Sequence, residues 1–292
     1  MGIPMNSLCI ECRLHKDLDT ARALGDDQTA TAFAKAHMKL FLDLKEGENS
    51  AYFGARIEEL FRQFYHVEED RFRAEKAQSN RFVLERLPML RSRVAKAEDP
   101  VYAALQLAVL GNYIDFSALR GEVSFQALED MLDKATDMAL DVPTYQKFLS
   151  DLQQGKNLLY ITDNAGEIGF DRVLAEQLQT RFPHLQITFC VRGGPVSNDA
   201  TREDAAAVDI DLPVIDSGCA IGGTVVELLS PEAKQALETA DVVLSKGMGN
   251  TESMYGCGYN VYYAFLIKCD RFIEFFGKPK MTPMFLRDSA SR

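Results

Sequence analysis

Residues 157–167, Asn-Leu-Leu-Tyr-Ile-Thr-Asp-Asn-Ala-Gly-Glu, indicate the fold of this chain more strongly than any other stretch. The first five residues form a short apolar run, which is typical of a buried strand in a parallel sheet. The polar residues and glycine that follow indicate a tight loop, and segment 170–178 then carries apolar residues at helical spacing. A strand, a loop and a helix in this order predict one unit of an α/β fold.

The same pattern repeats toward the C-terminus. Further strands are predicted at 186–191, 212–215, 242–244 and 262–267, and helices at 201–208, 224–229, 231–237 and 271–276. Alternating strands and helices predict a mainly parallel, doubly wound sheet with helices on both faces. We therefore expect residues 151–292 to form a Rossmann-like α/β domain, a three-layer α/β/α sandwich.

The first half of the chain, residues 1–150, predicts helices only. Apolar residues at helical spacing occur at 30–44, 52–65, 68–87, 100–110, 124–132 and 143–152, without strand-like alternation. Pro88 is expected to end the third of these helices, and Gly111 the fourth. The sequence thus predicts an all-helical N-terminal subdomain before the α/β domain.

The composition predicts a globular, cytoplasmic protein. The chain has 292 residues, of which 47% are hydrophobic and 26% charged. No apolar run approaches the ~20 residues that span a bilayer, and the N-terminus lacks a signal-peptide pattern. We therefore expect no membrane partner, and the oligomeric state stays open.

The net charge of −11 bears on the possible ligands. It argues against a nucleic-acid partner, because such proteins concentrate Lys and Arg on one face. An acidic protein also repels small phosphorylated molecules. A site for such molecules would therefore need a metal ion and a nearby cationic side chain to make the local electrostatic potential positive.

Polar residues follow each of the first four predicted strands, in segments 162–167, 192–199, 216–219 and 245–250. In an open parallel sheet, ligands bind outside the carboxyl ends of the strands. Each segment combines a glycine with a carboxylate, an amide or a lysine, which a purely structural sheet does not require. We therefore expect a ligand site at this edge of the sheet.

Three oxygen donors at these strand ends suggest a metal site. Asp163 and Asn164 are adjacent just past the first strand, and Asp199 follows the second. Two carboxylates and an amide oxygen suit a hard divalent cation such as magnesium or manganese. Alternatively, Asp163 only caps the next helix, but the other three polar segments favour a site. We predict a divalent metal cofactor, Mg, Mn, Co or Ni.

Lys246 follows the fourth strand in a segment flanked by glycine. Its ammonium group would supply the cation that a phosphate needs, and the backbone amides of Gly247 and Gly249 could approach that phosphate closely. The alternative is a solvated loop lysine. Arg192 and Asn250, from the same set of segments, are further candidates for substrate binding.

Asn112 and Asp115 follow a predicted helix in a polar turn. They could reach a ligand across the junction between the two predicted domains. A turn without function is the alternative reading.

Cys9 and Cys12 form a CxxC motif near the N-terminus. A structural zinc site needs four ligands, and Cys269 could be a third only if the N-terminus folds over the sheet. A second metal or a redox role for these three cysteines therefore competes with simple packing of buried thiols.

The polar motifs resemble those of the damage-control metabolite phosphatases, long known as domain-of-unknown-function family 89. The matching motifs are Asp-Asn-Ala-Gly-Glu at 163–167, Arg-Gly-Gly-Pro-Val-Ser-Asn-Asp-Ala at 192–200, Asp-Ser-Gly at 216–218 and Ser-Lys-Gly-Met-Gly-Asn at 245–250. The resemblance extends through Lys76, Asn80 and residues 111–115. The CxxC motif with a late Lys-Cys pair resembles a microbial subfamily.

This resemblance implies a helical subdomain on an α/β/α sandwich and metal-dependent hydrolysis of small phosphorylated metabolites, such as sugar phosphates or damaged phospho-metabolites. The implied roles are metal binding by Asp163, Asn164 and Asp199, phosphate binding by Lys246, and contacts to the substrate by Glu167, Asn112 and Asp115. We predict Asp163 and Lys246 as catalytic residues. Met248 departs from the family, in which a polar residue is common at this position.

Two other functions are compatible with parts of the sequence. A Rossmann-like sheet with acidic strand ends can hold S-adenosylmethionine, which would make the protein a methyltransferase. A non-catalytic metal- or metabolite-binding protein would use the CxxC motif instead. The polar segments favour the phosphatase, in which the attacking group is either water or Asp163 itself.

Overall fold

The computed structural model describes residues 2–67, 70–115 and 124–287, and it confirms the predicted class of fold. Six strands form one sheet in the order β3-β2-β1-β4-β5-β6. The first five strands run parallel and β6 is antiparallel to β5. The strands are β1 (Asn157–Ile161), β2 (Gln186–Val191), β3 (Val214–Asp216), β4 (Val242–Lys246), β5 (Val261–Leu266) and β6 (Pro283–Arg287).

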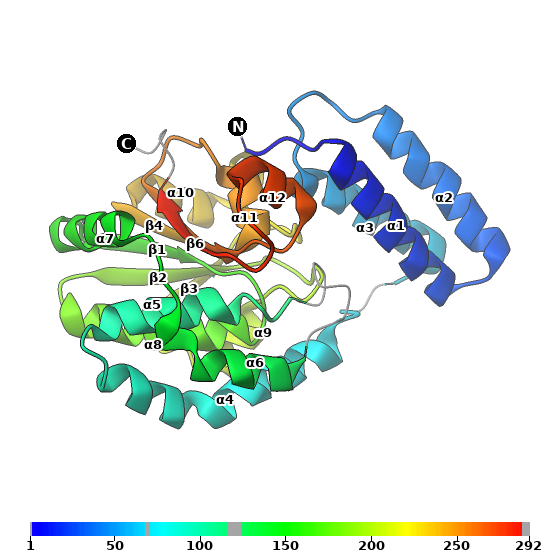
Figure 1. Cartoon of the computed structure of the whole chain (residues 1–292). Helices are drawn as coiled ribbons and strands as arrows, with labels where there is room; N and C mark the ends of the chain where they lie inside the picture. The colour runs from blue at the N-terminus through cyan, green and yellow to red at the C-terminus, as the bar shows by residue number, and fades with distance from the viewer. Residues whose placement is uncertain (1, 68–69, 116–123, 288–292) are drawn as a thin grey trace.

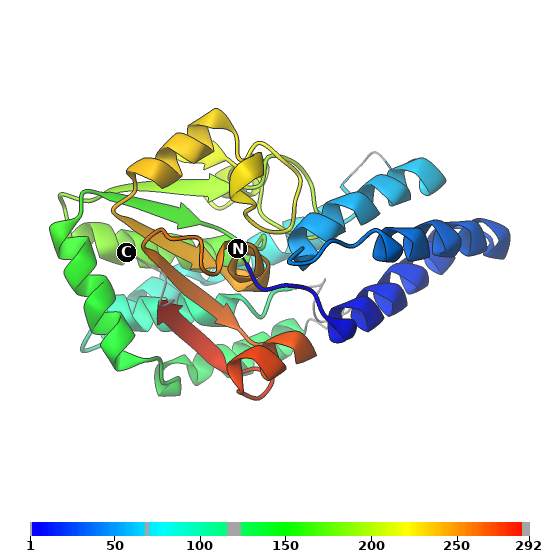
Figure 2. The same cartoon turned by 90° about the horizontal axis from the view of Figure 1, so that it is seen from above.

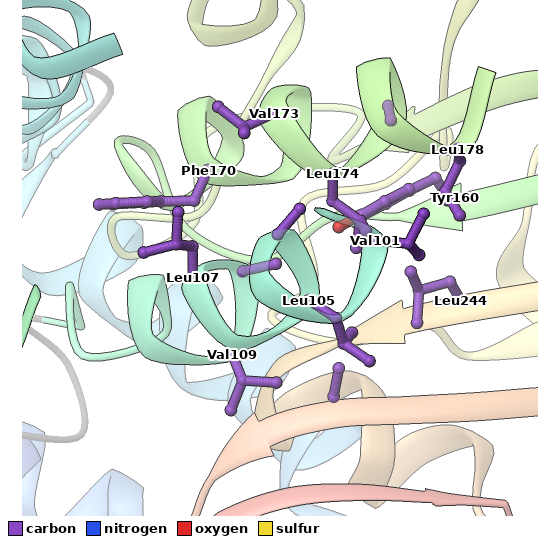
Figure 3. Close-up of a cluster of buried hydrophobic side chains, with 14 of the residues drawn as sticks. Val101, Leu105, Leu107, Val109, Tyr160, Phe170, Val173, Leu174, Leu178 and Leu244 are labelled. Atoms are coloured by element: carbon purple, nitrogen blue, oxygen red, sulfur yellow. The ribbon is translucent and has the colours of Figure 1, made fainter. Parts of the chain in front are cut away.

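Helices cover both faces of the sheet and complete the three predicted layers (Figure 1). One face carries α5 (Pro100–Gly111) and α8 (Glu167–Arg181), with α4 (Arg73–Ala95), α6 (Phe125–Asp133), α7 (Val142–Gln154) and α9 (Arg202–Ala207) in the same hydrophobic cluster or beside it. The other face carries α10 (Pro231–Thr239), α11 (Gly247–Met254) and α12 (Asp270–Phe276). Apolar side chains of α5 and α8 meet each other above Tyr160 of β1 and Leu244 of β4 (Figure 3).

The first three helices form a separate lobe. These are α1 (Ser7–Leu24), α2 (Asp27–Leu42) and α3 (Ser50–Tyr65), and they project from one end of the α/β body (Figures 1 and 2). Their apolar side chains, including Phe33, Phe53 and Phe61, form a cluster of their own. The helices α4–α7 instead share the core of the sheet. The domain boundary between residues 150 and 151 stays a prediction. Within the helical half, the hydrophobic clusters change between α3 and α4, because α1–α3 form one cluster and α4–α7 belong to the cluster of the sheet.

Several predicted elements differ from those observed. Helix α4 continues through Pro88 to Ala95, because buried Leu87, Leu90 and Val94 pack against the body and offset the lost backbone hydrogen bond. Residues 68 and 69 of the predicted helix 68–87 lie outside the described residues. Segment 224–229 contains only a short 3₁₀ turn, Val226–Leu228. Its β-branched residues favour helix weakly.

Other elements have no counterpart in the predictions. Helix α1, helix α11 and strand β6 are examples, and a second 3₁₀ turn spans Ala135–Asp137. The predicted strand 212–215 is observed two residues later, at Val214–Asp216. Within the described residues, no helix is both long enough and apolar enough to cross a membrane.

The strand order places a ligand crevice beside β1. The chain moves outward from β1 to β2 and β3 on one side, and then returns to β4 on the other side of β1. The loop after β1 leads to α8 on one face of the sheet, and the loop after β4 leads to α11 on the other face. The two loops therefore separate at the carboxyl edge, between β1 and β4. This is the point at which the predicted metal donors lie.

Candidate functional site

The three predicted metal donors are brought together by the backbone after β1 and β2. Asn164 and Asp199 form an isolated antiparallel bridge, and the backbone N–H of Ala200 donates to the carbonyl oxygen of Asp163 at 2.7 Å. All three donors are largely buried. The close approach predicted from the parallel-sheet pattern is thus present in the structure.

Neighbouring amides and a glycine orient the Asp163 carboxylate. Its Oδ2 accepts hydrogen bonds from Asn164 Nδ2 at 2.8 Å and from Asn112 Nδ2 at 3.0 Å. Gly247, the first residue of α11, has a φ of +81°, and a Cβ atom there would overlap this carboxylate. The absence of a side chain lets Asp163 lie directly against the start of α11.

Arg192 lies behind the two carboxylates rather than in front of them. Its Nε donates to Asp199 Oδ2 at 2.6 Å, and its Nη2 lies 3.5 Å from Asp163 Oδ1. Its Nη1 donates to Asn250 Oδ1 at 2.8 Å. Asn250 in turn donates to the carbonyl oxygen of Thr162 at 2.9 Å. Arg192 and Asn250 therefore hold the acidic residues in place from the interior.

Lys246 is also internal, and its side chain is 0% exposed. Its Nζ donates to Glu167 Oε1 and Asp171 Oδ1, both at 2.7 Å, and to the carbonyl oxygen of Ala108 at 2.8 Å. These acceptors use all three N–H groups of an ammonium ion. The structure thus places Lys246 in an internal ion cluster, where its ammonium group has no donor left for a phosphate.

Glu167 connects this cluster to the predicted metal donors. Its Oε2 accepts hydrogen bonds from the side-chain nitrogens of Asn164 at 2.8 Å and Asn112 at 3.0 Å. Its side chain is fully enclosed. Because Asn164 directs its amide nitrogen toward Glu167 and Asp163, the amide oxygen lies on the opposite side of that group.

A cleft of about 650 Å³ opens in front of the donors. Of the predicted site residues, Asp115, Asp163, Asn164 and Asp199 line it, together with the three cysteines. Asn112, Glu167, Arg192, Lys246, Gly247 and Asn250 do not line it and support it from behind. The far wall comes from α1 and α3, so the helical lobe and the α/β body together enclose the cleft.

Lys268 is the most buried of the three lysines that line this cleft, the others being Lys16 and Lys280. It follows β5, its residue exposure is 3%, and its Nζ donates to Asp115 Oδ2 at 2.6 Å and to the carbonyl oxygen of Asn112 at 2.7 Å. The sequence pattern assigned it no role, although it belongs to the Lys-Cys pair noted above. Its contact with Asp115 would have identified it as a candidate, but Asp115 lies 153 residues away, and local sequence patterns do not contain such contacts.

Negative charge exceeds positive charge at the base of the cleft. The buried acids are Asp115, Asp163, Glu167, Asp171 and Asp199, and the buried cations among them are Arg192, Lys246 and Lys268. The half-buried Lys16 of α1 also interacts with Asp115 from the far wall. Burial, together with the nearby carboxylates of Asp199 and Glu167, raises the pKa of Asp163 well above its usual range. Burial also raises the pKa of Asp199.

This charge balance fits a divalent cation. If every buried group is ionised, these eight groups carry two unmatched negative charges, and Lys16 adds one positive charge near Asp115. A divalent ion held by two carboxylates and an amide oxygen would neutralise them and favour ionised acids. The donor set of Asp163, Asn164 and Asp199 is thus chemically suited to the predicted metal.

Cys9, Cys12 and Cys269 line the same cleft, because the N-terminus does fold over the body. The backbone N–H of Ile3 donates to the carbonyl oxygen of Glu252 at 2.7 Å. Among the described residues, no group of three or more His, Cys, Asp or Glu side chains is arranged to hold a metal ion. The second metal site at these three cysteines therefore stays a prediction.

The redox role of these cysteines stays a prediction. All three are free thiols in the structure. Burial raises the pKa of Cys9 and takes that of Cys269 to about 12. Both side chains are therefore thiols rather than reactive thiolates at neutral pH.

Comparison with known proteins gives consistent results across nearly the whole chain. Residues 5–283 match the sequence model of the family described as "Damage-control phosphatase ARMT1-like domain". An uncharacterised protein of Methanocaldococcus jannaschii, MJ0202, is 30% identical over 92% of this chain and 90% of its own length. A damage-control phosphatase of Archaeoglobus fulgidus is 29% identical over 86% and 87% of the two chains.

A solved structure shows the same fold. The crystal structure of a DUF89 family protein from Pyrococcus horikoshii superposes with a TM-score of 0.83. The alignment covers 98% of this chain and 99% of that one, at 25% sequence identity.

Proposed function

Because the chain belongs to the damage-control phosphatase ARMT1-like domain family, we propose that it hydrolyses small phosphorylated metabolites with the help of a divalent metal ion. Sugar phosphates and damaged phospho-metabolites are the proposed substrates. The observation that carries the metal dependence is the excess of buried carboxylates over buried cations around Asp163 and Asp199. A phosphate ester could not bind beside these acids unless a cation neutralised them.

Asp163, Asn164 and Asp199 would hold the metal, which would draw electrons from a phosphoryl oxygen and offset charge on the transferring group. Two amides and Gly247 fix the rotamer of Asp163, and Arg192 fixes Asp199. Such support keeps donor atoms in place before the ligand arrives. The buried Arg192 also limits repulsion between the two carboxylates.

Lys268 would bind the phosphate, a role that the resemblance had implied for Lys246. Among the described residues its ammonium group donates to two acceptors, which leaves one N–H group for a phosphate oxygen. Met248 and Gly249 of the first turn of α11 line the same cleft and present backbone amides there. In this proposal Lys246 is a buried supporting residue.

The phosphatase is tested by removing the metal and then its donors. After dialysis against a chelator, the protein should not hydrolyse an aryl phosphate, and one of Mg, Mn, Co or Ni should restore activity. Asp163→Asn should lower kcat/KM by about 10³-fold or more, because a metal donor and candidate nucleophile is lost. Asp209→Asn, on the surface, is the matched control.

Activity that survives both chelation and Asp163→Asn would refute the proposal. Rapid acid quenching of a single turnover with labelled substrate separates the two nucleophiles. Label retained on the protein and released by hydroxylamine would identify Asp163, and unlabelled protein would identify water.

The two alternative functions give different results in simple binding tests. A methyltransferase would release heat on titration with S-adenosylmethionine, whereas the proposed phosphatase would not. A non-catalytic binding protein would bind phosphate esters in the presence of metal without releasing phosphate.

A further inference from the structure

Glu252 is a carboxyl group in the cleft for which the proposed chemistry has no role so far. It lies on α11, is half-buried, and lines the cleft. Among the described residues, no Lys, Arg or His nitrogen lies within 4.0 Å of its carboxylate. Arg13 of α1 and Arg271 of α12 act on it only from farther away. A partly buried carboxyl group that lines a cavity, with no cation within 4.0 Å among the described residues, is suited to contact a ligand.

The position of Glu252 along α11 places it on the cleft side of the helix whose first turn lies at the proposed phosphate position. Met248, Gly249 and Glu252 all line the cleft, and their spacings of three and four residues put them on one face of the helix. Gly247, at the start of that helix, lies against Asp163. Five residues of helix rise by about 7.5 Å, and side chains on a helix tilt toward its N-terminus. The Cα–Cβ bond of Glu252 therefore tilts toward the end of α11 that lies against Asp163.

The surroundings of Glu252 favour its protonated form near neutral pH. Burial raises its pKa to about 7, and the more distant guanidinium groups of Arg13 and Arg271 oppose this only in part. The thiols of Cys9 and Cys269 also lie close enough to interact with its charge. They are uncharged at neutral pH because their own pKa values are raised.

We propose that Glu252 contacts the alcohol portion of the substrate and acts as the general acid for its departure. As water or the Asp163 carboxylate forms a new bond to phosphorus, the bond between phosphorus and the ester oxygen breaks, and its electron pair stays on that oxygen. The carboxyl proton of Glu252 moves to the same oxygen, which leaves as an alcohol, and the carboxylate then recovers a proton from solvent. This inference rests on the proposed phosphatase activity and adds to it a residue that distinguishes between leaving groups.

The test compares two leaving groups in the Glu252→Gln variant. The phenolate of p-nitrophenyl phosphate leaves without a proton, whereas the alkoxide of glycerol 3-phosphate needs one. With general acid catalysis, kcat/KM for the alkyl ester should fall by about 10²-fold or more, and that for the aryl ester by less than about threefold. Glu252→Asp retains an acid and should recover part of the loss. Glu232→Gln, on the exposed surface of α10, is the matched control.

The dependence on pH gives a second readout. In the wild-type protein, kcat for the alkyl ester should fall as pH rises through about 7, because only the protonated carboxyl group can donate. Glu252→Gln should lack this decline. A thermal unfolding curve checks that the variant is folded.

The possible failures are distinguishable. Equal losses on both esters, or an unchanged pH profile, would overturn the role of Glu252 while leaving the phosphatase proposal intact. A wild-type protein that hydrolyses neither ester with any of the four metals would instead overturn the phosphatase proposal itself.

Discussion

Single residues at this site act mainly by fixing the positions of others. Gly247 shows this most directly, because its positive φ and its contact with the Asp163 carboxylate both exclude a side chain. Asn112 joins Asp163, Glu167 and the backbone of Leu266 through one amide group. Neither residue contacts the cleft, yet both determine which way the acidic donors point. Mutations at such positions should therefore change metal binding without removing a donor.

Gly247→Ala tests this expectation. The new methyl group must displace Asp163, and the left-handed backbone adds strain of about 1 kcal/mol or more. We expect metal affinity, measured by calorimetry on the chelated protein, to fall by about tenfold or more. Gly256→Ala is the control, because this glycine also has a positive φ but has open space around it. Equal metal affinity in the two variants would contradict the prediction.

At the scale of elements, α4 holds the turn that carries the proposed metal donors Asp163 and Asn164. Asn80 of α4 accepts a hydrogen bond from the backbone N–H of Gly166 at 2.7 Å and donates to Asp204 of α9 at 2.9 Å. Lys76, one turn earlier, pairs with the same aspartate at 2.8 Å. Gly166 has a φ of +78° and lies against Ser79, so a larger residue would separate α4 from the turn.

Asn80→Ala should therefore destabilise both the fold and the site. It leaves the buried N–H of Gly166 without its acceptor, which costs about 1–3 kcal/mol. Urea unfolding of the metal-free protein measures this loss, and calorimetry should show weaker metal binding. Gln78→Ala, exposed on the same helix, should leave both quantities unchanged. If the two variants unfold at the same urea concentration, α4 does not support the turn as inferred.

At the scale of the whole molecule, the net charge of the protein opposes the binding of the proposed substrate. The chain carries a net charge of −11, whereas the proposed substrate is an anion. In the proposed mechanism, a bound metal ion and Lys268 make the base of the cleft attractive to a phosphate. The long-range field therefore opposes the approach of substrate, and the local field favours its binding.

Salt should consequently increase the rate of substrate capture. Raising the ionic strength from about 0.01 M to 0.15 M shortens the Debye length from about 30 Å to about 8 Å. At constant free metal, kcat/KM for a dianionic ester should rise severalfold, because repulsion by distant acids is screened. The value of kcat at saturation should change little. A fall in kcat/KM over this range would mean that the cleft itself dominates the encounter.

Local sequence patterns determined most of the α/β body. The apolar runs of β1 and β2 and the helical spacing in α8 identify those elements almost residue by residue, because a strand buried on both faces must be apolar throughout. The polar residues at the strand ends located the site, since parallel strands bring their carboxyl ends to one edge. Pro88, by contrast, misled the prediction for α4, because tertiary packing can offset a lost hydrogen bond.

Only the tertiary structure decided which polar residues face the cleft and which support it. Lys246 and Lys268 both follow strands, and the sequence motif favoured Lys246. In the fold, Lys246 is enclosed by Asp171 of α8 and the carbonyl oxygen of Ala108 in α5, whereas Lys268 reaches the cleft through Asp115. These partners lie 75, 138 and 153 residues away in the sequence. The direction of a buried charge depends on such distant neighbours, because desolvation is offset only by the groups that the fold places around it.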